Sequence, residues 1–586
     1  MTLKANSVIE KTFFALLPMQ IIMTVISSIN SIIDGVIASN FVSTSALAVI
    51  ALFMPVVKAL DTINTIFLGG SQILCGQYIG KNQMKRSVSV FSTDMLFIFS
   101  VGMTATVLCY VFSRPIAALF VDDEIVISEL CDYIRGFSLG IVPMMFIPQL
   151  TAFLQLERQE KRTYAGMTAM IVLNVSLDLI FVSVLDMGML GLGLATSVSN
   201  LAFFIILVTY YLFKNPAIGF DIHEIRLSEC KNIVHVGLPG AVSSLGQTVR
   251  SVLLNVIMLS FVGSSGISAF SAVYSFGCVY WAVSGGVANA VRVLSSIYAG
   301  EEDRTGLHTI VKTALTKGTA LVSITAAFCM LCAPLFTRIF FGADAGPVYK
   351  MTLAGFVLFP LTMPLSCICC VFSNYYQCLN RLKAVNILML IDSFLGVIAF
   401  SFILAPLLGM NGVWLAHIAS GMVTLLIIFI YTWIFNKRVP GSVTDLLVLE
   451  NDFGVSEEDR IDIRITDMKD VINLSEAVVE FSKRHHIDGR RAMFSGLCVE
   501  EMAGNIVKHG FDGKKEYNLD VRVIYKEDVL LIRLKDNCRP FNPKEVQGLF
   551  EPDDVTRNIG LRLVSRNAKE MSYNNCLGIN VLNITV

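Results

Sequence analysis

Twelve long apolar segments fill the first 438 residues of the chain, and they constrain its fold more than any other feature. A helix needs about 20 mostly apolar residues to cross the hydrocarbon core of a bilayer. Every segment reaches that length, so we expect an all-α polytopic membrane part with twelve transmembrane helices. They are predicted at residues 12–38, 46–79, 88–112, 130–155, 164–185, 190–213, 233–261, 268–298, 310–335, 348–378, 384–408 and 412–435.

Charged residues divide the chain into a membrane part and a soluble part. Only 16% of the residues are charged, whereas about 25% is usual for a soluble domain, and the charge density rises to that level only after Lys437. A basic stripe with interleaved aromatics is missing, which argues against a nucleic-acid partner. We expect a first lobe at 1–218, a second lobe at 219–438, a linker at 439–458 and a soluble domain at 459–586.

Lysine and arginine predict the orientation in the membrane. They gather at both ends of the membrane part and in every second connection, for example at Lys81, Arg158 and Lys312. Because basic loops stay on the cytoplasmic side, both termini are expected to be cytoplasmic. Because the number of spans is even, the soluble tail is expected on the same side of the membrane as the N-terminus, which is the cytoplasmic side. The expected location is the inner (plasma) membrane of a bacterial cell, with the lipid bilayer as a partner.

The two halves of the membrane part resemble each other. The segment GMLGLGLATSVS at 188–199 matches GMNGVWLAHIAS at 409–420, and internal repeats are typical of transporters. Six spans in each half make the repeat parallel, with its axis along the membrane normal. We therefore expect two six-helix lobes around a central cavity that opens to alternate sides.

These features together resemble the multidrug and toxic compound extrusion (MATE) family of cation-coupled antiporters. The resemblance covers residues 8–436, and it includes Leu17-Pro18 in the first span, matched by Leu238-Pro239 in the seventh. It implies that the chain exports a small organic solute in exchange for Na⁺ or H⁺.

Four polar residues in the first lobe match the family's cation site. Asn174 and Asp178 are four residues apart in the fifth span and share a helix face, while Asp34 lies in the first span and Thr196 in the sixth. The resemblance implies that these residues bind the coupling ion, with Asp34 and Asp178 as Na⁺ or proton ligands. The alternative is that they only hydrogen-bond between spans.

The second lobe lacks this pattern, because Asn255 occupies the position that corresponds to Asp34, and His417 occupies the position that corresponds to Thr196. Coupling is therefore expected in the first lobe. Two arginines within apolar spans suggest a cavity for an anionic or zwitterionic cargo, although they can also pair with carbonyls or snorkel. The residues assigned to this cavity are Lys58, Asp61, Arg250, Asn255 and Arg292, and the first two can also simply pair with each other.

The soluble tail has an α/β pattern that follows a polar stretch at 437–459. Helices are predicted at 467–485, 490–509 and 559–571. Strands are predicted at 519–525, 529–535 and 580–586.

Three motifs in this tail occur in an order that resembles the histidine-kinase-like ATPase fold, closest to the anti-sigma-factor kinases. They are Glu501-x-x-x-Asn505 on the second helix, Asp536 after the strand pair, and NIGLRLVSR at the third helix. The resemblance implies an α/β sandwich that binds ATP with Mg²⁺. Glu501 would be the catalytic base, Asn505 the Mg²⁺ ligand and Asp536 the adenine reader. Further nucleotide-binding residues would be Lys508, Phe541, Gly560 and Leu561.

Two departures from the ATPase pattern bear on its activity. Cys538 and Asn558 stand where that fold has glycine, so a degenerate module that only binds a partner is the alternative. A serine/threonine kinase-like activity toward a cytoplasmic regulatory protein also stays open.

The prediction for the whole chain is a cation-coupled antiporter with an ATP-binding regulatory or kinase-like domain. The sequence has no GxxxxGK[ST] phosphate loop, so we do not expect ATP to drive transport directly. Two alternatives are a flippase for lipid-linked precursors and a membrane receptor whose tail phosphorylates a cytoplasmic partner.

Overall fold

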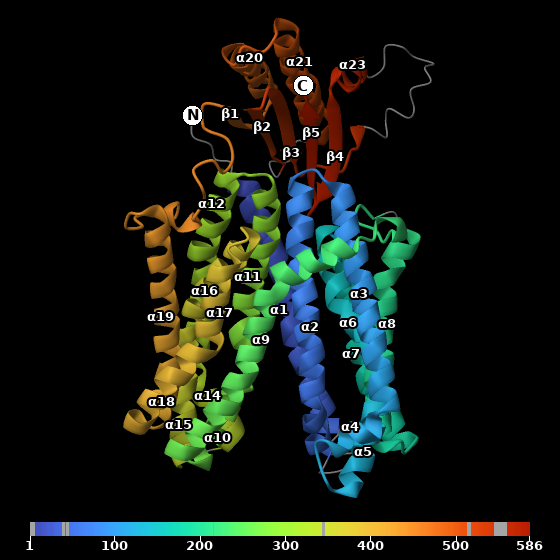
Figure 1. The fold of residues 1–586 in the computed structure, drawn as a ribbon, viewed down its shortest axis with the longest axis vertical. Coiled ribbons are helices and arrows are strands. Elements are labelled where there is room, and N and C mark those ends of the chain that lie inside the picture. Colours follow the sequence, from blue (N-terminus) through green and yellow to red (C-terminus); the bar gives the residue numbers. More distant parts are fainter. Residues whose placement is uncertain are drawn as a thin grey trace.

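The computed structural model describes residues 6–37, 42, 46–214, 216–342, 346–511, 517–543 and 559–586. A long bundle of helices carries a small α/β domain at one end (Figure 1). Among the described residues, ten helices are long and apolar enough to span a membrane. Two further pairs, bent by 45° and 49°, bring the number to twelve if each pair is one span. The predicted fold class, a polytopic helical membrane part with an α/β domain, is confirmed.

The first lobe begins at α1 and ends at α8. A π-helical turn, η2, directly continues α7. The elements are α1 (Asn6–Ile37), α2 (Ala46–Gly80), α3 (Met84–Val111), α4 (Ser113–Ala118), α5 (Glu124–Ser138), α6 (Ile141–Leu156), α7 (Glu160–Leu179), η2 (Ile180–Val184) and α8 (Gly188–Phe213).

The second lobe follows after the short turn η3 (Ile222–Glu224). Its elements are α9 (Leu227–Phe261), α10 (Ser264–Tyr274), α11 (Gly277–Gly300), α12 (Arg304–Thr313), η4 (Ala314–Gly318), α13 (Thr319–Leu331), α14 (Ala333–Phe341), α15 (Pro347–Leu358), η5 (Phe359–Leu361), α16 (Thr362–Cys378), α17 (Leu382–Leu390), η6 (Ile391–Leu395), α18 (Gly396–Leu408) and α19 (Met410–Asn436).

The lobes meet where α1 and α2 pack against α9 and α11. Glycines bring the α2 and α9 backbones into contact near the α/β domain: a Cβ on Gly70 would lie 2.0 Å from the Ile233 carbonyl oxygen, and one on Gly237 would lie 1.8 Å from that of Ile66. Further along, Thr62 and Ser244 share a hydrogen bond of 2.8 Å. Beyond this point the two helices diverge (Figure 1). The lobes are therefore in contact on the side that carries the α/β domain.

The α/β domain is one antiparallel sheet with helices on one face. The strand order is β1-β2-β3-β5-β4. Its strands are β1 (Arg460–Ile465), β2 (Leu519–Lys526), β3 (Val529–Asp536), β4 (Glu570–Cys576) and β5 (Ile579–Thr585), and its helical elements are α20 (Met468–Arg484), α21 (Gly489–Asn505), η8 (Ile506–Gly510) and α23 (Ile559–Asn567). Alternate strand residues such as Val521, Ile532 and Ile584 fill the core beneath these helices. The opposite face of the sheet lies toward the membrane part (Figure 1).

The sequence-based assignment of this domain was wrong in one place and incomplete in another. The helix predicted at 559–571 ends at Asn567, and the residues from Glu570 onward form β4. The polar segment EMSYNNC has a weak strand signal of its own, and it is extended because it pairs with β5. Strand β1, with the alternating sequence RIDIRI, was not predicted either.

The segment expected to be a linker packs along the second lobe. It contains the short turn η7 (Asp445–Leu447). The hydroxyl of Tyr375 donates to the Leu447 carbonyl at 3.0 Å, and that of Tyr376 donates to the Leu446 carbonyl at 3.2 Å. Leu447 and Val448 are buried in the hydrophobic core of the membrane part. The segment therefore fixes where the α/β domain begins.

Candidate functional site

Two residues of the predicted cation site lie buried on α7. Asn174 and Asp178 are 0% and 1% exposed, one turn apart, and the π-helical turn η2 begins two residues after Asp178. Such turns are frequent at functional sites because they change the direction in which side chains point. The Asn174 amide makes no hydrogen bond to any described residue. A buried amide oxygen beside a buried carboxylate is a donor set that suits a hard cation.

The helices that carry the other two residues pack against α7. Thr196 lies on α8, which contacts α7, and its hydroxyl donates to the Leu192 carbonyl at 3.1 Å. Asp34 lies on α1, which also contacts α7, but its side chain is outside the described residues. The structure thus brings together the three helices that carry these residues.

The residues predicted to form a cargo cavity lie on three helices, α2, α9 and α11. Lys58 and Asp61 pair on α2 at 3.4 Å, with side chains 58% and 46% exposed. Arg250 of α9 donates to the Tyr274 hydroxyl at 3.5 Å, and Asn255 is exposed on the same helix. Arg292 is the one member of this set found among the residues lining the cavity described next.

A polar cavity of about 290 Å³ lies between the lobes at Arg292. Arg292 donates to the Asn289 side chain at 2.8 Å. The first lobe contributes Thr65 of α2, and the second lobe contributes the rest. Its other polar lining residues are Ser243, Ser244, Gln247, Asn374 and Gln377.

Two acids within spans of the membrane part, one buried and one partly exposed, were missed. Asp94 of α3 is 0% exposed and lies beside Ser71 of α2. Asp392 of η6 lies within electrostatic reach of Arg250, so it supplies a charge partner for that arginine inside the second lobe. An acid within an apolar run, as in STDML and LIDSF, is the signal that would have found both.

The first part of the predicted nucleotide site lies where α21 ends and α23 begins. Glu501 and Asn505 are one turn apart on α21, and a Cβ on Gly560 would fall 1.7 Å from the Glu501 Oε2 atom. The Glu501 carboxylate therefore lies against the N-terminal turn of α23, where a helix favours negative charge. Glycine is needed at 560 for this approach.

The second part of the nucleotide site is at the end of β3. Asp536 is 5% exposed, and its Oδ1 atom accepts from the Cys538 backbone N–H at 2.9 Å and from the Asn580 amide at 2.7 Å. Burial raises the pKa of Asp536, and these two hydrogen bonds oppose that rise. Asn580, which sequence analysis missed, therefore orients the acid expected to read adenine.

The remaining residues predicted to bind the nucleotide differ in how far they are exposed to solvent. Lys508 of η8 is exposed, and Phe541 is exposed with its N–H donating to the Tyr573 hydroxyl at 3.1 Å. The side chain of Leu561 is buried in the domain core, where it packs against the sheet and helices. Cys538 is buried close to Gly510: a Cβ on Gly510 would lie 2.9 Å from the Cys538 sulfur. Asn558 lies outside the described residues.

The described residues match the needs of an adenine nucleotide. Asp536 offers an oriented acceptor for the amino group, and Asn505 and Lys508 offer an amide and a positive charge for Mg²⁺ and phosphates. Among the described residues, no group of three or more histidine, cysteine or acidic side chains is placed to hold a metal ion. Asn505 would supply an oxygen ligand to a Mg²⁺ ion that the nucleotide's phosphates also bind.

Comparisons with known proteins match both parts of the chain. The MatE family model matches residues 20–180 and 239–403, and the model described as "Histidine kinase-like ATPase domain" matches residues 466–585. The chain is 25% identical over 302 residues to "Probable multidrug resistance protein YoeA" of Bacillus subtilis, which covers 48% of this chain and 64% of that protein. It is 24% identical over 267 residues to "Multidrug export protein MepA" of Staphylococcus saprophyticus, covering 42% and 56%. The chain thus spans less than two thirds of the length of these relatives.

Solved structures share the fold of the membrane part. A MATE protein in complex with MaL6 matches with a TM-score of 0.67 and 20% identity, over 73% of this chain and 98% of that one. A MOP superfamily transporter from Pyrococcus furiosus matches with a TM-score of 0.66 and 20% identity, over 74% and 97%. The two lobes, the ten to twelve candidate spans among the described residues and the matched segments lead to one conclusion: the chain belongs to the MatE family and carries a histidine kinase-like ATPase domain at its C-terminal end.

Proposed function

We propose that the chain is an antiporter in the inner membrane of a bacterial cell, exporting a small organic solute in exchange for Na⁺ or H⁺. In this proposal both termini and the ATPase-like domain lie in the cytoplasm, and that domain binds Mg²⁺-ATP to regulate transport. The multidrug transporters among the relatives support the class of cargo. The contact between the lobes on the domain side, with divergence beyond it, supports alternating access.

The observation that carries the proposal is the buried pair on α7. A carboxylate inside a membrane span is costly and is normally retained for a function. Asp178 is 1% exposed beside an amide, Asn174, that lacks a hydrogen-bond partner among the described residues. An incoming Na⁺ would be bound by the Asn174 amide oxygen and the Asp178 carboxylate, whereas a proton would be bound by the Asp178 carboxylate alone.

The test is Asp178→Asn in the full-length protein in proteoliposomes, with export of a fluorescent organic cation driven by an imposed Na⁺ or H⁺ gradient. The variant should lose gradient-driven export because the amide has no negative charge for either ion. Asp186→Asn is the matched control, since Asp186 is exposed at the end of the same span, and it should transport normally. Export that persists in Asp178→Asn would contradict the proposed coupling site.

A separate experiment tests the nucleotide site. Asn505→Ala in the full chain should abolish Mg²⁺-ATP binding in a calorimetric titration, because the amide expected to hold Mg²⁺ is gone. Asn473→Ala, an exposed change on α20, should bind as the parent does. Normal binding by Asn505→Ala would show that the motif is assigned wrongly. No binding by the parent would favour the degenerate, partner-docking module.

A further inference from the structure

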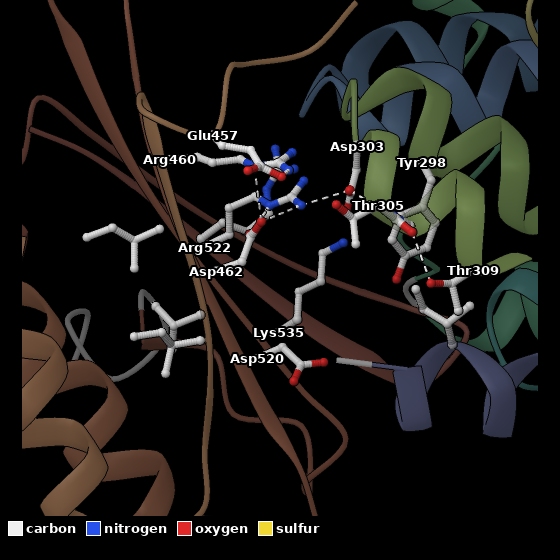
Figure 2. Close-up of a pocket in the computed structure, with 16 residues that line it drawn as sticks. Tyr298, Asp303, Thr305, Thr309, Glu457, Arg460, Asp462, Asp520, Arg522 and Lys535 are labelled. Carbon is white, nitrogen blue, oxygen red and sulfur yellow. Dashed lines mark hydrogen bonds and ion pairs between the residues drawn. The ribbon is translucent and has the colours of Figure 1, made fainter. Parts of the chain in front are cut away.

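The helix-free face of the ATPase-like sheet carries a row of charges. On β2 the odd-numbered residues from Leu519 to Val523 are buried in the domain core, so Arg522 points to the other face. On β3 the even-numbered residues fill the core in the same way, and Arg533 and Lys535 point to the face that carries Arg522. Figure 2 shows Arg522 and Lys535 extending from the sheet toward Asp303 and Tyr298 of the membrane part.

The partner of this row is the acidic turn between α11 and α12. Arg522 bonds Asp303 at 2.7 Å, and Lys535 bonds Glu301 at 2.5 Å. Arg533 approaches Glu301 at 3.3 Å, and the Lys535 ammonium lies 4.2 Å from the centre of the Tyr298 ring. Glu302, between these two acids, pairs with Lys526 of β2 at 3.1 Å, so three acids in sequence meet basic residues of the sheet.

Apart from Glu302, whose pair with Lys526 is exposed, these charges are buried in the contact. The side chain of Glu301 is 4% exposed, that of Arg533 is 7% and that of Asp303 is 10%. Burial alone would raise the pKa of Asp303, but the positive charges of Arg522 and Lys535 and the hydrogen bonds from Gly306 and Arg522 outweigh it, and the pKa is lowered. Removing one partner from such a cluster leaves an uncompensated charge out of water.

The same domain also contacts the first lobe, through the β4–β5 hairpin. Its turn consists of Leu577 and Gly578, both with positive φ, at +54° and +67°. The Leu577 N–H donates to the Leu156 carbonyl at 2.7 Å. A Cβ on Gly578 would lie 2.3 Å from the Arg158 side chain, so glycine permits the close approach.

A second contact with the first lobe comes from β4, where the Asn574 amide donates to the Asn82 side chain at 3.1 Å. The hairpin therefore contacts two connections of the first lobe, while the basic row contacts the second lobe.

We propose that the helix-free face of this sheet is a docking surface for the rims of both lobes, and that docking holds the lobes together on the domain side. A transporter that opens toward this domain must separate Leu156 and Asn82 from Glu301 and Asp303. One rigid sheet bonded to both groups opposes that separation. The ATPase-like domain thereby favours the arrangement that is closed on its own side, and its release is required for the opposite one.

The test measures the separation of the lobes and needs no transport activity. Fluorescent labels are introduced through unnatural amino acids at Lys85 and Lys383, which are exposed on α3 and α17, in the full-length protein in nanodiscs. Single-molecule energy transfer then reports the distance between the lobes. The parent should give one main population at short distance. Glu301→Lys, which places a third positive charge beside Lys535 and Arg533, should add a population at longer distance.

Two further variants make the result decisive. Glu480→Lys has the same charge change on the exposed face of α20 and should match the parent. Asn82→Cys with Asn574→Cys, oxidised to a disulfide in the parent background, fixes the sheet to the first lobe while the basic row still contacts the second lobe, so it should keep the short distance. In the Glu301→Lys background the same disulfide should leave the long-distance population in place, because the contact with the second lobe stays broken. An unchanged distribution in folded Glu301→Lys would overturn the proposal. Because the readout is distance, failure here is distinguishable from failure of the proposed transport function.

Discussion

At the scale of single residues, Asn580 connects the expected adenine reader to its surroundings. Its amide nitrogen donates to Asp536 Oδ1 at 2.7 Å and to the Cys538 carbonyl at 3.2 Å. Its oxygen accepts from the Tyr573 hydroxyl and from the Asn575 amide, both at 2.7 Å. Asn580 is 3% exposed. With both ends of the amide bonded, this side chain is fixed, and it fixes Asp536 in turn.

Asn580→Ala should therefore weaken nucleotide binding without unfolding the domain. A hydrogen bond to a charged group contributes about 1.5–3 kcal/mol, and each 1.4 kcal/mol is about tenfold in affinity. We expect a loss of about 10- to 100-fold in Mg²⁺-ATP affinity, measured by calorimetry on the full chain. Asn567→Ala is the control, because its amide bonds only the Leu563 carbonyl of its own helix among the described residues. Equal affinities in both variants would show that Asn580 does not position Asp536 for the nucleotide.

At the scale of elements, the contact between α2 and α9 depends on positions without side chains. Gly70 and Gly237 each face the backbone of the opposite helix. Small residues allow such close approach of helices in membranes, where packing rather than the hydrophobic effect drives association. A methyl group at either position meets a backbone oxygen, which cannot move aside as a flexible side chain would.

Gly237→Ala should push α2 and α9 apart and destabilise the described arrangement. Overpacking typically costs about 1–3 kcal/mol, so we expect a lower thermal transition of the full-length protein in nanodiscs. Gly285→Ala on α11 is the matched control, since a Cβ there meets no atom within 4 Å. If the two variants unfold at the same temperature, the close packing of α2 on α9 does not limit stability.

At the scale of the whole molecule, the contact between the membrane part and the ATPase-like domain contains buried and exposed ion pairs. Arg522 is 13% exposed and bonds both Asp303 and Asp462. Lys526 and Glu302 pair at 3.1 Å with side chains 50% and 44% exposed. The Arg522–Asp303 and Lys526–Glu302 pairs join the same strand to the same turn, so they allow a direct comparison of a buried ion pair with an exposed one.

Arg522→Ala should destabilise the molecule far more than Lys526→Ala. Breaking a buried pair costs about 3–5 kcal/mol because a remaining buried acid, here Asp303, loses its ion-pair partner, while an exposed pair contributes about 0–1 kcal/mol. The measurement is thermal unfolding of the full-length variants, each compared with the parent. Equal effects would mean that the interface is accessible to water and that docking does not depend on the buried charges.

The sequence by itself determined the spans, the two lobes and the order of the nucleotide motifs. These are local properties: the length of an apolar run, a repeated segment such as 188–199, and the four-residue spacing of Glu501 and Asn505. Lys58 and Asp61 were also within reach of sequence reasoning, because residues three apart on a helix meet. Strand β4 was not, because its extended conformation depends on pairing with β5.

Only the tertiary structure decided what the charges of β2 and β3 contact. Alternating charge in a strand normally indicates a face exposed to water, so Arg522, Arg533 and Lys535 gave no sign of a buried partner. That partner, the acidic turn at Glu301–Asp303, lies more than 200 residues earlier in the chain. The linker packs on the second lobe in the same way, through Leu447 and Val448. Such contacts join segments that are distant in sequence, and a local pattern records the charge of a side chain but not the surface that it meets.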